Sequence, residues 1–165
     1  MIREIFTIGV YGTSETSFFA APSRHNISRF VDIRRRCGMR GGRYAYANST
    51  ALKSRLREMG IAYERRLDLA PTKDIRSVEN KADSVRNTTK SSRAGLSPEF
   101  VAQNESECLA GFDAAGFLDR YPPDARIVLF CLEARTTACH RSTLAECIRR
   151  ERGLTRRDIT PGGTS

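Results

Sequence analysis

The chain has 165 residues, of which 39% are hydrophobic and 28% charged, a composition typical of one globular domain with a buried core. No apolar run approaches the ~18 residues that a membrane-spanning helix needs, so we expect no such helix. The net charge is +9, with arginine far more frequent than lysine, and a field of this sign attracts phosphate-bearing partners.

Five cysteines are spread along the chain without the regular spacing of a disulfide framework. The first ten residues, MIREIFTIGV, have the pattern of a strand rather than of a secretory signal peptide. Together these features predict a cytoplasmic protein whose cysteines are free thiols or thiolate ligands.

Short apolar runs alternate with amphipathic segments in the first part of the chain. We predict strands over residues 5–10, 29–34 and 61–67. Between them, a short helix capped by Thr13 or Ser14 ends before Pro22. A second helix begins at a cap at Ser49 and ends at Gly60.

Residues 72–96 are mostly polar but contain one narrow apolar stripe with helical spacing, formed by Ile75, Val78, Ala82 and Val85. We predict a helix over residues 73–86, followed by a mobile loop that reaches Gly95. A polar segment of this kind can act as a lid over a site. Disorder of the whole segment is the alternative.

The second half of the chain begins with a strong helix start. Ser97 followed by Pro98 has the pattern of a helix N-terminus, and helical sequence continues to about Tyr121 with a break near Gly111 or Gly116. We then predict a buried strand over residues 126–133, a helix over about 142–152 and a short last strand over 158–160.

This alternation of strands and helices predicts one three-layer α/β domain over residues 1–165, with a mainly parallel sheet between helices. Sheets of this kind bind ligands at the carboxyl ends of their strands. Site residues are therefore expected where the predicted strands end.

The first strand ends in GVYGTS, where Gly9 and Gly12 flank a turn whose backbone amides can hold an anion. The spacing matches neither a P-loop nor a dinucleotide-binding fingerprint. An ordinary glycine turn is therefore the alternative.

The second strand ends in DIRRRCGMRGGRYAYAN, which has five arginines within ten residues and no acidic residue among them. Arginine binds phosphate through a planar fork, and tyrosine offers a face for stacking. We expect ligand contacts from Arg34, Arg36, Arg40, Arg43, Tyr44 and Tyr46. A solvated loop paired with acids of neighbouring helices is the alternative. Asp32 is either a general base or the counter-charge that anchors an arginine.

The third strand leads into FCLEARTTACHRSTLAECI, which contains Cys131, Glu133, Cys139, His140 and Arg141. Cys131 and Glu133 are two residues apart and should share a face of the strand. Thr143 and Glu146 have capping-box spacing, which places the CHR triplet at the start of the last helix. The helix dipole and Arg141 should lower the pKa of a thiol there.

Three interpretations of this stretch stay open. In the first, Cys139 or Cys131 is a catalytic nucleophile. His140 and Glu133 then transfer protons, and Arg141 binds an anionic substrate. The Cys-x5-Arg spacing of phosphatase loops is absent, so that chemistry is not supported.

In the second interpretation, Cys131, Cys139 and His140 hold zinc together with Glu133 or Cys37. The adjacent residues Cys139 and His140 are expected to point in different directions, and no Cys-x2-Cys knuckle is present. We therefore assign no metal ligand from the sequence and keep zinc as the alternative to a protein without a cofactor.

In the third interpretation, the same groups are structural. Cys131 is then a small core residue, His140 and Glu133 form a buried hydrogen-bonded pair, and Arg141 contacts the helix end. Cys147 and Cys108 are expected in the core.

The chain resembles domain of unknown function 488, a family of uncharacterised bacterial and archaeal proteins. The similar segments are TIG at 7–9, VDIR at 31–34, GIAY at 60–63 and CLE…CHR at 131–141, while RRRCGMRGGRYAYAN and LAPT at 69–72 are similar to one subgroup. The resemblance covers nearly the full chain and implies a compact α/β fold with a functional centre built from the strand-end motifs. The family's pattern usually closes with a histidine-isoleucine pair, where this sequence has Asp158 and Ile159.

We expect an enzyme whose strand-end pocket acts on a phosphate-bearing ligand, either a nucleotide or nucleic acid. A non-catalytic nucleic-acid-binding accessory protein, with structural cysteines or a structural metal, is the alternative. Salt-sensitive binding that survives Cys139→Ala would favour the accessory protein. Activity lost on the same change, with folding intact, would favour the enzyme. The sequence does not set the oligomeric state.

Overall fold

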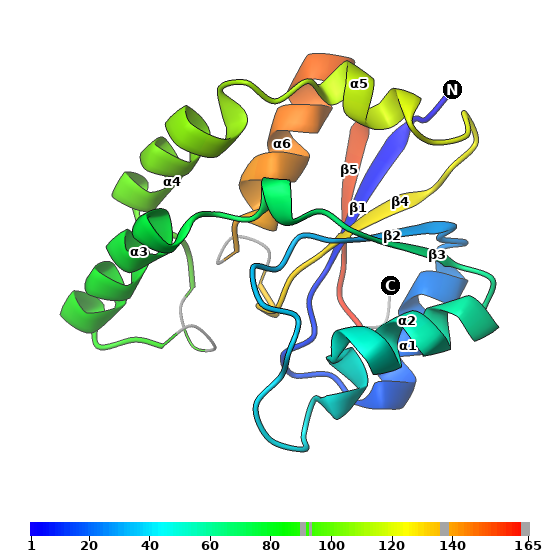
Figure 1. Cartoon of the computed structure of the whole chain (residues 1–165), viewed down its shortest axis with the longest axis horizontal. Helices are drawn as coiled ribbons and strands as arrows, with labels where there is room; N and C mark the ends of the chain where they lie inside the picture. Colours follow the sequence, from blue (N-terminus) through cyan, green and yellow to red (C-terminus); the bar gives the residue numbers. More distant parts are fainter. Residues whose placement is uncertain (90–91, 93, 136–138, 163–165) are drawn as a thin grey trace.

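The computed structural model describes residues 1–89, 92, 94–135 and 139–162, and for residues 107 and 108 the backbone only. Five strands form one sheet with the order β3-β2-β4-β1-β5, and every neighbouring pair runs parallel (Figure 1). The strands are β1 (Glu4–Ile8), β2 (Arg29–Asp32), β3 (Ala62–Arg65), β4 (Ile127–Phe130) and β5 (Thr155–Ile159). The predicted α/β fold with a parallel sheet is confirmed.

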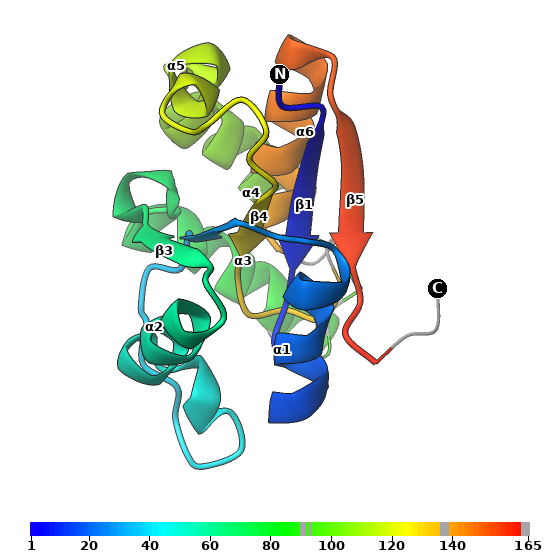
Figure 2. The same ribbon diagram turned by 90° about the vertical axis from the view of Figure 1, so that its right-hand side faces the viewer.

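Helices cover both faces of the sheet. On one face lie α1 (Glu15–Arg24) and α2 (Ser49–Glu58), and on the other lie α5 (Ala114–Asp119) and α6 (Arg141–Arg152) (Figures 1 and 2). The central strand β4 is buried on both sides. Its alternate side chains Val128 and Phe130 face α1 and α2, while Ile127 and Leu129 face α5 and α6.

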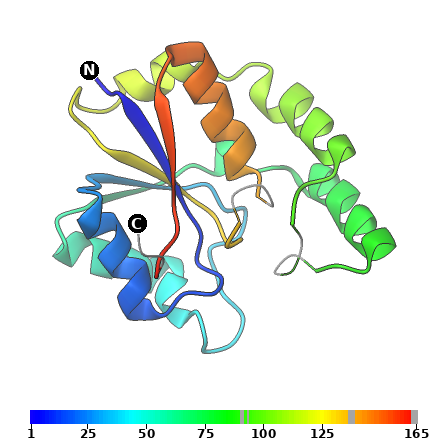
Figure 3. The ribbon, with the colours of Figure 1, turned by 180° about the vertical axis from the view of Figure 1, so that it is seen from behind.

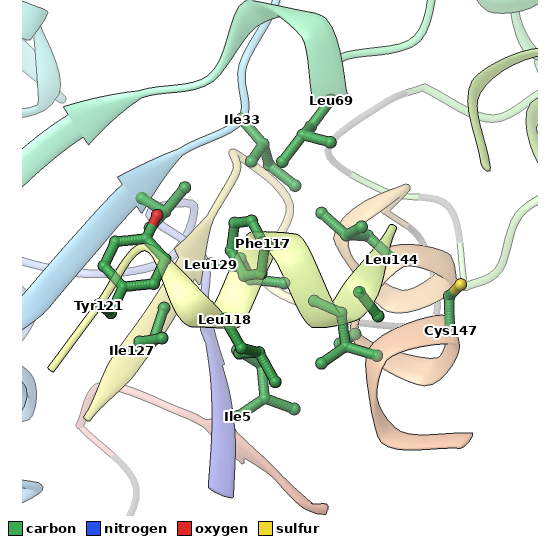
Figure 4. Close-up of a cluster of buried hydrophobic side chains, with 14 of the residues drawn as sticks. Ile5, Ile33, Leu69, Phe117, Leu118, Tyr121, Ile127, Leu129, Leu144 and Cys147 are labelled. Carbon is green, nitrogen blue, oxygen red and sulfur yellow. The ribbon is translucent and has the colours of Figure 1, made fainter. Parts of the chain in front are cut away.

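The core on the α5 and α6 side is shown in Figure 4. Phe117 and Leu118 of α5 and Leu144 of α6 pack over Ile5 of β1 and Leu129 of β4. Cys147 lies in the same buried cluster, as its helical spacing predicts, whereas the side chain of Cys108 is outside the described part of the chain.

Two further helices, α3 (Lys73–Arg86) and α4 (Pro98–Asn104), pack against each other beside the sheet (Figures 1 and 3). Both helix predictions are confirmed, and the Ser97 side chain caps α4 by accepting a hydrogen bond from the amide of Phe100. A π-helical turn over Glu105–Leu109 follows, and the helical path breaks before α5, near the predicted Gly111. Residues 90, 91 and 93 of the predicted mobile loop lie outside the described residues.

The apolar stripe of α3 does not form its buried face. Ile75 and Glu79 are buried, whereas Val85 is 88% exposed. The Glu79 carboxylate accepts hydrogen bonds from the Ser97 amide at 2.9 Å, the Ser97 hydroxyl at 2.7 Å and Arg86 at 2.7 Å. Polar contacts with the start of α4 therefore decide which side of α3 turns inward.

Several element ends differ from their predicted positions. The first helix continues through Pro22 to Arg24, because burial of its apolar side chains outweighs the one hydrogen bond that proline removes near the end. The cap of α2 is Asn48 rather than Ser49. Thr143 lies inside α6, where its hydroxyl donates to the His140 carbonyl, so the predicted capping box is wrong.

The strand connections open a crevice at one edge of the sheet. The chain leaves β1 and β2 toward the face covered by α1 and α2, but it leaves β4, which lies between them, toward α6 on the opposite face. Connections that part in this way create a ligand-binding crevice at the carboxyl ends of the strands. Among the described helices, none is long and apolar enough to span a membrane.

Candidate active site

Asp32 and Arg34, at the end of β2, form a buried ion pair. The guanidinium donates from Nε to Oδ1 at 2.8 Å and from a terminal nitrogen to Oδ2 at 2.6 Å, and the two side chains are 0% and 1% exposed. Its other terminal nitrogen donates to the Ala47 carbonyl at 2.8 Å, and the group lies over the ring of Phe130. Of the two interpretations of Asp32, this pair supports the anchoring counter-charge.

Tyr63 and Cys37 also contact the Asp32 carboxylate. The Tyr63 hydroxyl donates to Oδ2 at 2.8 Å, and the Cys37 thiol lies 3.7 Å from the same oxygen. Burial and the nearby carboxylate raise the pKa of the Tyr63 hydroxyl and that of the Cys37 thiol. Both groups therefore stay protonated near neutral pH, and Cys37 does not join the cysteines that follow β4.

The aromatic residues of the arginine-rich loop hold that loop against the end of β1. Tyr44 accepts a hydrogen bond from the Gly12 amide at 2.9 Å, and Tyr46 donates to the Thr13 carbonyl at 3.0 Å. The ring of Tyr46 also packs against α1, and Arg43 lies over the ring of Tyr44. Both tyrosines are thus largely engaged in the fold.

Gly9 directly follows β1 and lies against the loop after β4. A side chain at this position would overlap the Glu133 carbonyl oxygen and approach the Arg141 guanidinium at 3.1 Å. Arg141 is fully buried and donates to the Glu133 carbonyl at 2.7 Å. Gly9 and Arg141 therefore position the loop after β4, and neither lines the pocket described below.

Cys131, Cys139 and His140 form a compact cluster at the end of β4. Their ligand-type atoms, the two sulfurs and the histidine Nδ1, all lie within 4.8 Å of one another. Each sulfur is 3.8 Å from Nδ1. The sequence-based expectation that Cys139 and His140 point in different directions is wrong, because the chain turns into α6 at His140 and brings both side chains to one point.

The other ring nitrogen fixes the tautomer of His140. Nε2 lies 3.0 Å from the carbonyl oxygen of Ile33, at the end of β2. A carbonyl only accepts hydrogen bonds, so the neutral imidazole carries its proton on Nε2. In that tautomer the lone pair of Nδ1 faces both sulfurs, and His140 links the end of β2 to the end of β4.

The prediction of a low thiol pKa is wrong for Cys139. Its side chain is 1% exposed, and this burial, together with the adjacent Cys131 sulfur, raises the pKa of the thiol above its ordinary value. His140 and Arg141 favour the thiolate but do not outweigh the loss of hydration. With its pKa raised in this way, the Cys139 thiol is protonated at neutral pH.

A pocket of about 390 Å³ lies over the cluster, which is within the usual range for a small-molecule site. Its floor includes Cys131, Glu133 and His140. The arginine-rich loop forms one side, with Arg35, Arg36 and Arg40, and α3 and α4 form the other, with Arg76, Glu79 and Phe100. Residues of the three strand-end segments and of the 72–96 segment therefore line one pocket. Closure of the 72–96 segment as a lid stays a prediction.

Comparison with protein-family models shows which family the chain belongs to. The family model for the domain of unknown function DUF488 matches residues 15–148, which is most of the chain. The chain belongs to the DUF488 family. Neither a curated protein nor a solved structure matches it.

In this DUF488 member, Asp158 stands at the place of the expected histidine, and its side chain is hydrogen-bonded within the sheet. The Asp158 carboxylate accepts hydrogen bonds from the Thr7 hydroxyl at 2.8 Å and from Arg156 at 3.0 Å. Although burial opposes it, hydrogen bonding to Arg156 and Thr7 lowers the pKa of Asp158. The side chain joins β5 to β1 and is not part of the strand-end pocket.

Arg76 and Phe100 are pocket residues of this DUF488 chain that sequence analysis missed. Arg76 lies next to Ile75 in α3, whose inward face includes the buried Glu79. The residue pattern alone does not show that Glu79 is buried, so it could not predict that Arg76 lines the pocket. Phe100 lies three residues after the Ser97 cap, so helical periodicity was the one available signal that it turns inward.

Proposed function

We propose that the protein is an enzyme acting on a small phosphate-bearing ligand, with nucleotides as the first class to test. The ligand binds in the strand-end pocket, and the reaction takes place at the cluster of Cys131, Cys139 and His140. The observation that carries this proposal is that unpaired arginines line the same pocket as Cys131 and His140 of that cluster.

Four arginines of the pocket have guanidinium groups without a partner among the described residues. Arg35, Arg36, Arg40 and Arg76 make no side-chain hydrogen bond or ion pair with any residue that the structure describes, in contrast to Arg34. They come from two different elements and line the same pocket. An anion between them relieves their mutual repulsion and takes up charge-assisted hydrogen bonds.

The floor of the pocket has groups suited to chemistry. Cys131 and Glu133 are buried but line the pocket, and Nδ1 of His140 lies 3.8 Å from the Cys131 sulfur. Such an imidazole can accept a thiol proton and create a nucleophile, or it can share a metal ion with the thiolates. Both chemistries need the ligand to lie directly above this floor.

Apolar side chains on the same walls favour a ligand larger than free phosphate. Tyr11 and Leu132 lie near the end of β1, and Leu96 and Phe100 lie on the α4 side. A pocket with cationic groups and with apolar or aromatic surface beside them suits a phosphate joined to a flat base. This composition supports a nucleotide over inorganic phosphate.

The proposal is tested by isothermal titration calorimetry with nucleoside mono- and diphosphates and with inorganic phosphate. The double variant Arg36→Ala/Arg40→Ala should bind the best nucleotide at least about tenfold more weakly, because each hydrogen bond to a charged group contributes about 1.5–3 kcal/mol.

The control is Arg150→Ala/Arg152→Ala, which makes the same change in net charge at exposed positions near the end of α6. It should bind with nearly wild-type affinity. Equal losses in both double variants, or no binding of any phosphate compound by the wild type, would contradict the proposal.

The accessory-protein alternative is favoured by one observation, the net charge of +9. Binding to nucleic acid through this charge alone should weaken steeply as salt rises and should be indifferent to which arginine pair is removed. The two double variants therefore separate the alternatives in a single series.

A further inference from the structure

The geometry points to a zinc site formed by the Sγ atoms of Cys131 and Cys139 and the Nδ1 atom of His140, with its fourth position open to the strand-end pocket. This inference deepens the proposed function and rests on it only for the use of that fourth position. The metal site itself depends only on the three clustered side chains.

The spacing of the three atoms fits a tetrahedral ion. With Zn–S distances of about 2.3 Å and Zn–N distances of about 2.0 Å, neighbouring ligand atoms of a tetrahedral zinc lie roughly 3.5–3.8 Å apart. In this protein, each sulfur lies 3.8 Å from Nδ1, and the sulfurs lie within 4.8 Å of each other. Small side-chain rotations bring all three atoms to bonding distance.

The hydrogen bond on the far side of His140 is a second, independent observation. Nε2 donates to the Ile33 carbonyl at 3.0 Å, which leaves the Nδ1 lone pair aimed at the sulfurs. Zinc-bound histidines commonly donate their second ring nitrogen to a carbonyl or carboxylate, because this contact fixes the tautomer and orients the ring. The ring of His140 is thus already oriented as a ligand.

The donor set selects the kind of metal. Two sulfurs and one imidazole suit zinc, whereas magnesium and calcium require oxygen ligands. Binding replaces two thiol protons by the ion, and these protons pass to solvent. The two thiolates then balance the charge of Zn²⁺, which removes the penalty of holding an isolated thiolate at the buried Cys139.

The pocket determines the kind of zinc site. Cys131 and His140 line the strand-end pocket, and Cys139 lies behind them. Cys37 is turned toward Asp32, and Glu133 is not one of the three clustered ligands. Three protein ligands with a fourth position open to a pocket are the pattern of catalytic zinc, in which the ion activates water or polarises a ligand oxygen.

The test is elemental analysis of the full chain purified without chelators, with Co²⁺ titration of the metal-free protein as a second measurement. We expect about one zinc per chain, and a cobalt spectrum with thiolate charge-transfer bands and the intense visible bands of tetrahedral coordination. Cys131→Ser and Cys139→Ser should each lose the zinc, while Cys147→Ser, at a buried cysteine of α6 outside the cluster, should retain it.

Zinc that persists in both cluster variants would overturn the inference. Because those variants can also fail to fold, the cobalt titration of the wild type decides independently, and the absence of thiolate bands there would overturn it as well. Metal content is measured without a nucleotide present. Nucleotide binding by a protein that holds no zinc would therefore refute the zinc site alone. Zinc without nucleotide binding would refute the proposed function alone.

Discussion

At the scale of single residues, the arginines near the strand ends divide according to their partners. Arg34 and Arg141 are buried, and their guanidinium groups hold the loops after β2 and β4. Arg36 and Arg40 have no such contacts within the described structure and line the pocket. Residues from one arginine-rich pattern thus serve the fold in some positions and are available to a ligand in others.

Replacing Asp32 with asparagine tests this division. The change leaves the buried Arg34 guanidinium without its counter-charge, so the free energy of unfolding should fall by about 3–5 kcal/mol. Asp68→Asn is the matched control, because Asp68 pairs with Arg66 at 2.7 Å but is largely exposed, and it should change stability by only about 0–1 kcal/mol. Urea unfolding of both variants measures the difference. An Asp32→Asn protein of normal stability without activity would instead favour the general-base role.

The residues of the site could be predicted only in part. Strand-end placement of Cys131, Glu133, Cys139 and His140 follows from the apolar run before them and the helix after them. Their convergence does not, because it depends on the turn at His140 and on a hydrogen bond to Ile33, which is 107 residues away in the sequence. Likewise, burial of Cys139 reverses the pKa shift that its place near a helix start suggests.

At the scale of elements, the pocket depends on how α3 and α4 pack. Glu79 lies on the buried face of α3, lines the pocket and binds the Ser97 cap of α4. The periodicity of α3 predicted its bounds correctly, but hydrophobicity alone could not reveal that a carboxylate faces inward. The spacing of apolar residues predicts only which apolar side chains are buried. The burial of Glu79 depends on a polar partner, Ser97, at the start of another helix.

Ser97→Ala tests the contact between the two helices. The variant loses the helix cap and one hydrogen bond to a buried carboxylate, so the protein should be destabilised by about 1–3 kcal/mol. Ser77→Ala, at an exposed position of α3, should change the free energy of unfolding by less than about 0.5 kcal/mol. Guanidinium unfolding curves provide the comparison. Equal, small effects would show that Ser97 does not hold α3 against α4.

At the scale of the whole molecule, strand order explains why distant motifs meet. The strand β4 lies between β1 and β2, so residues near positions 10, 35 and 131 share one edge of the sheet. Alternation of strands and helices predicted a parallel sheet and hence an edge where the motifs gather. The order of the strands within that sheet rests on tertiary packing, which is why the partners of each motif could not be assigned beforehand.

In the proposed function, the ligand and the cysteine cluster share one pocket. The most direct test is the rate at which iodoacetamide modifies Cys131 in protein stripped of metal by a chelator, mapped by mass spectrometry with and without a saturating nucleotide that binds this protein. Cys37, which does not line the pocket, is the internal reference. We expect the nucleotide to slow modification of Cys131 and to leave the rate at Cys37 nearly unchanged; an unchanged rate at Cys131 under saturating nucleotide would show that the two do not share a pocket.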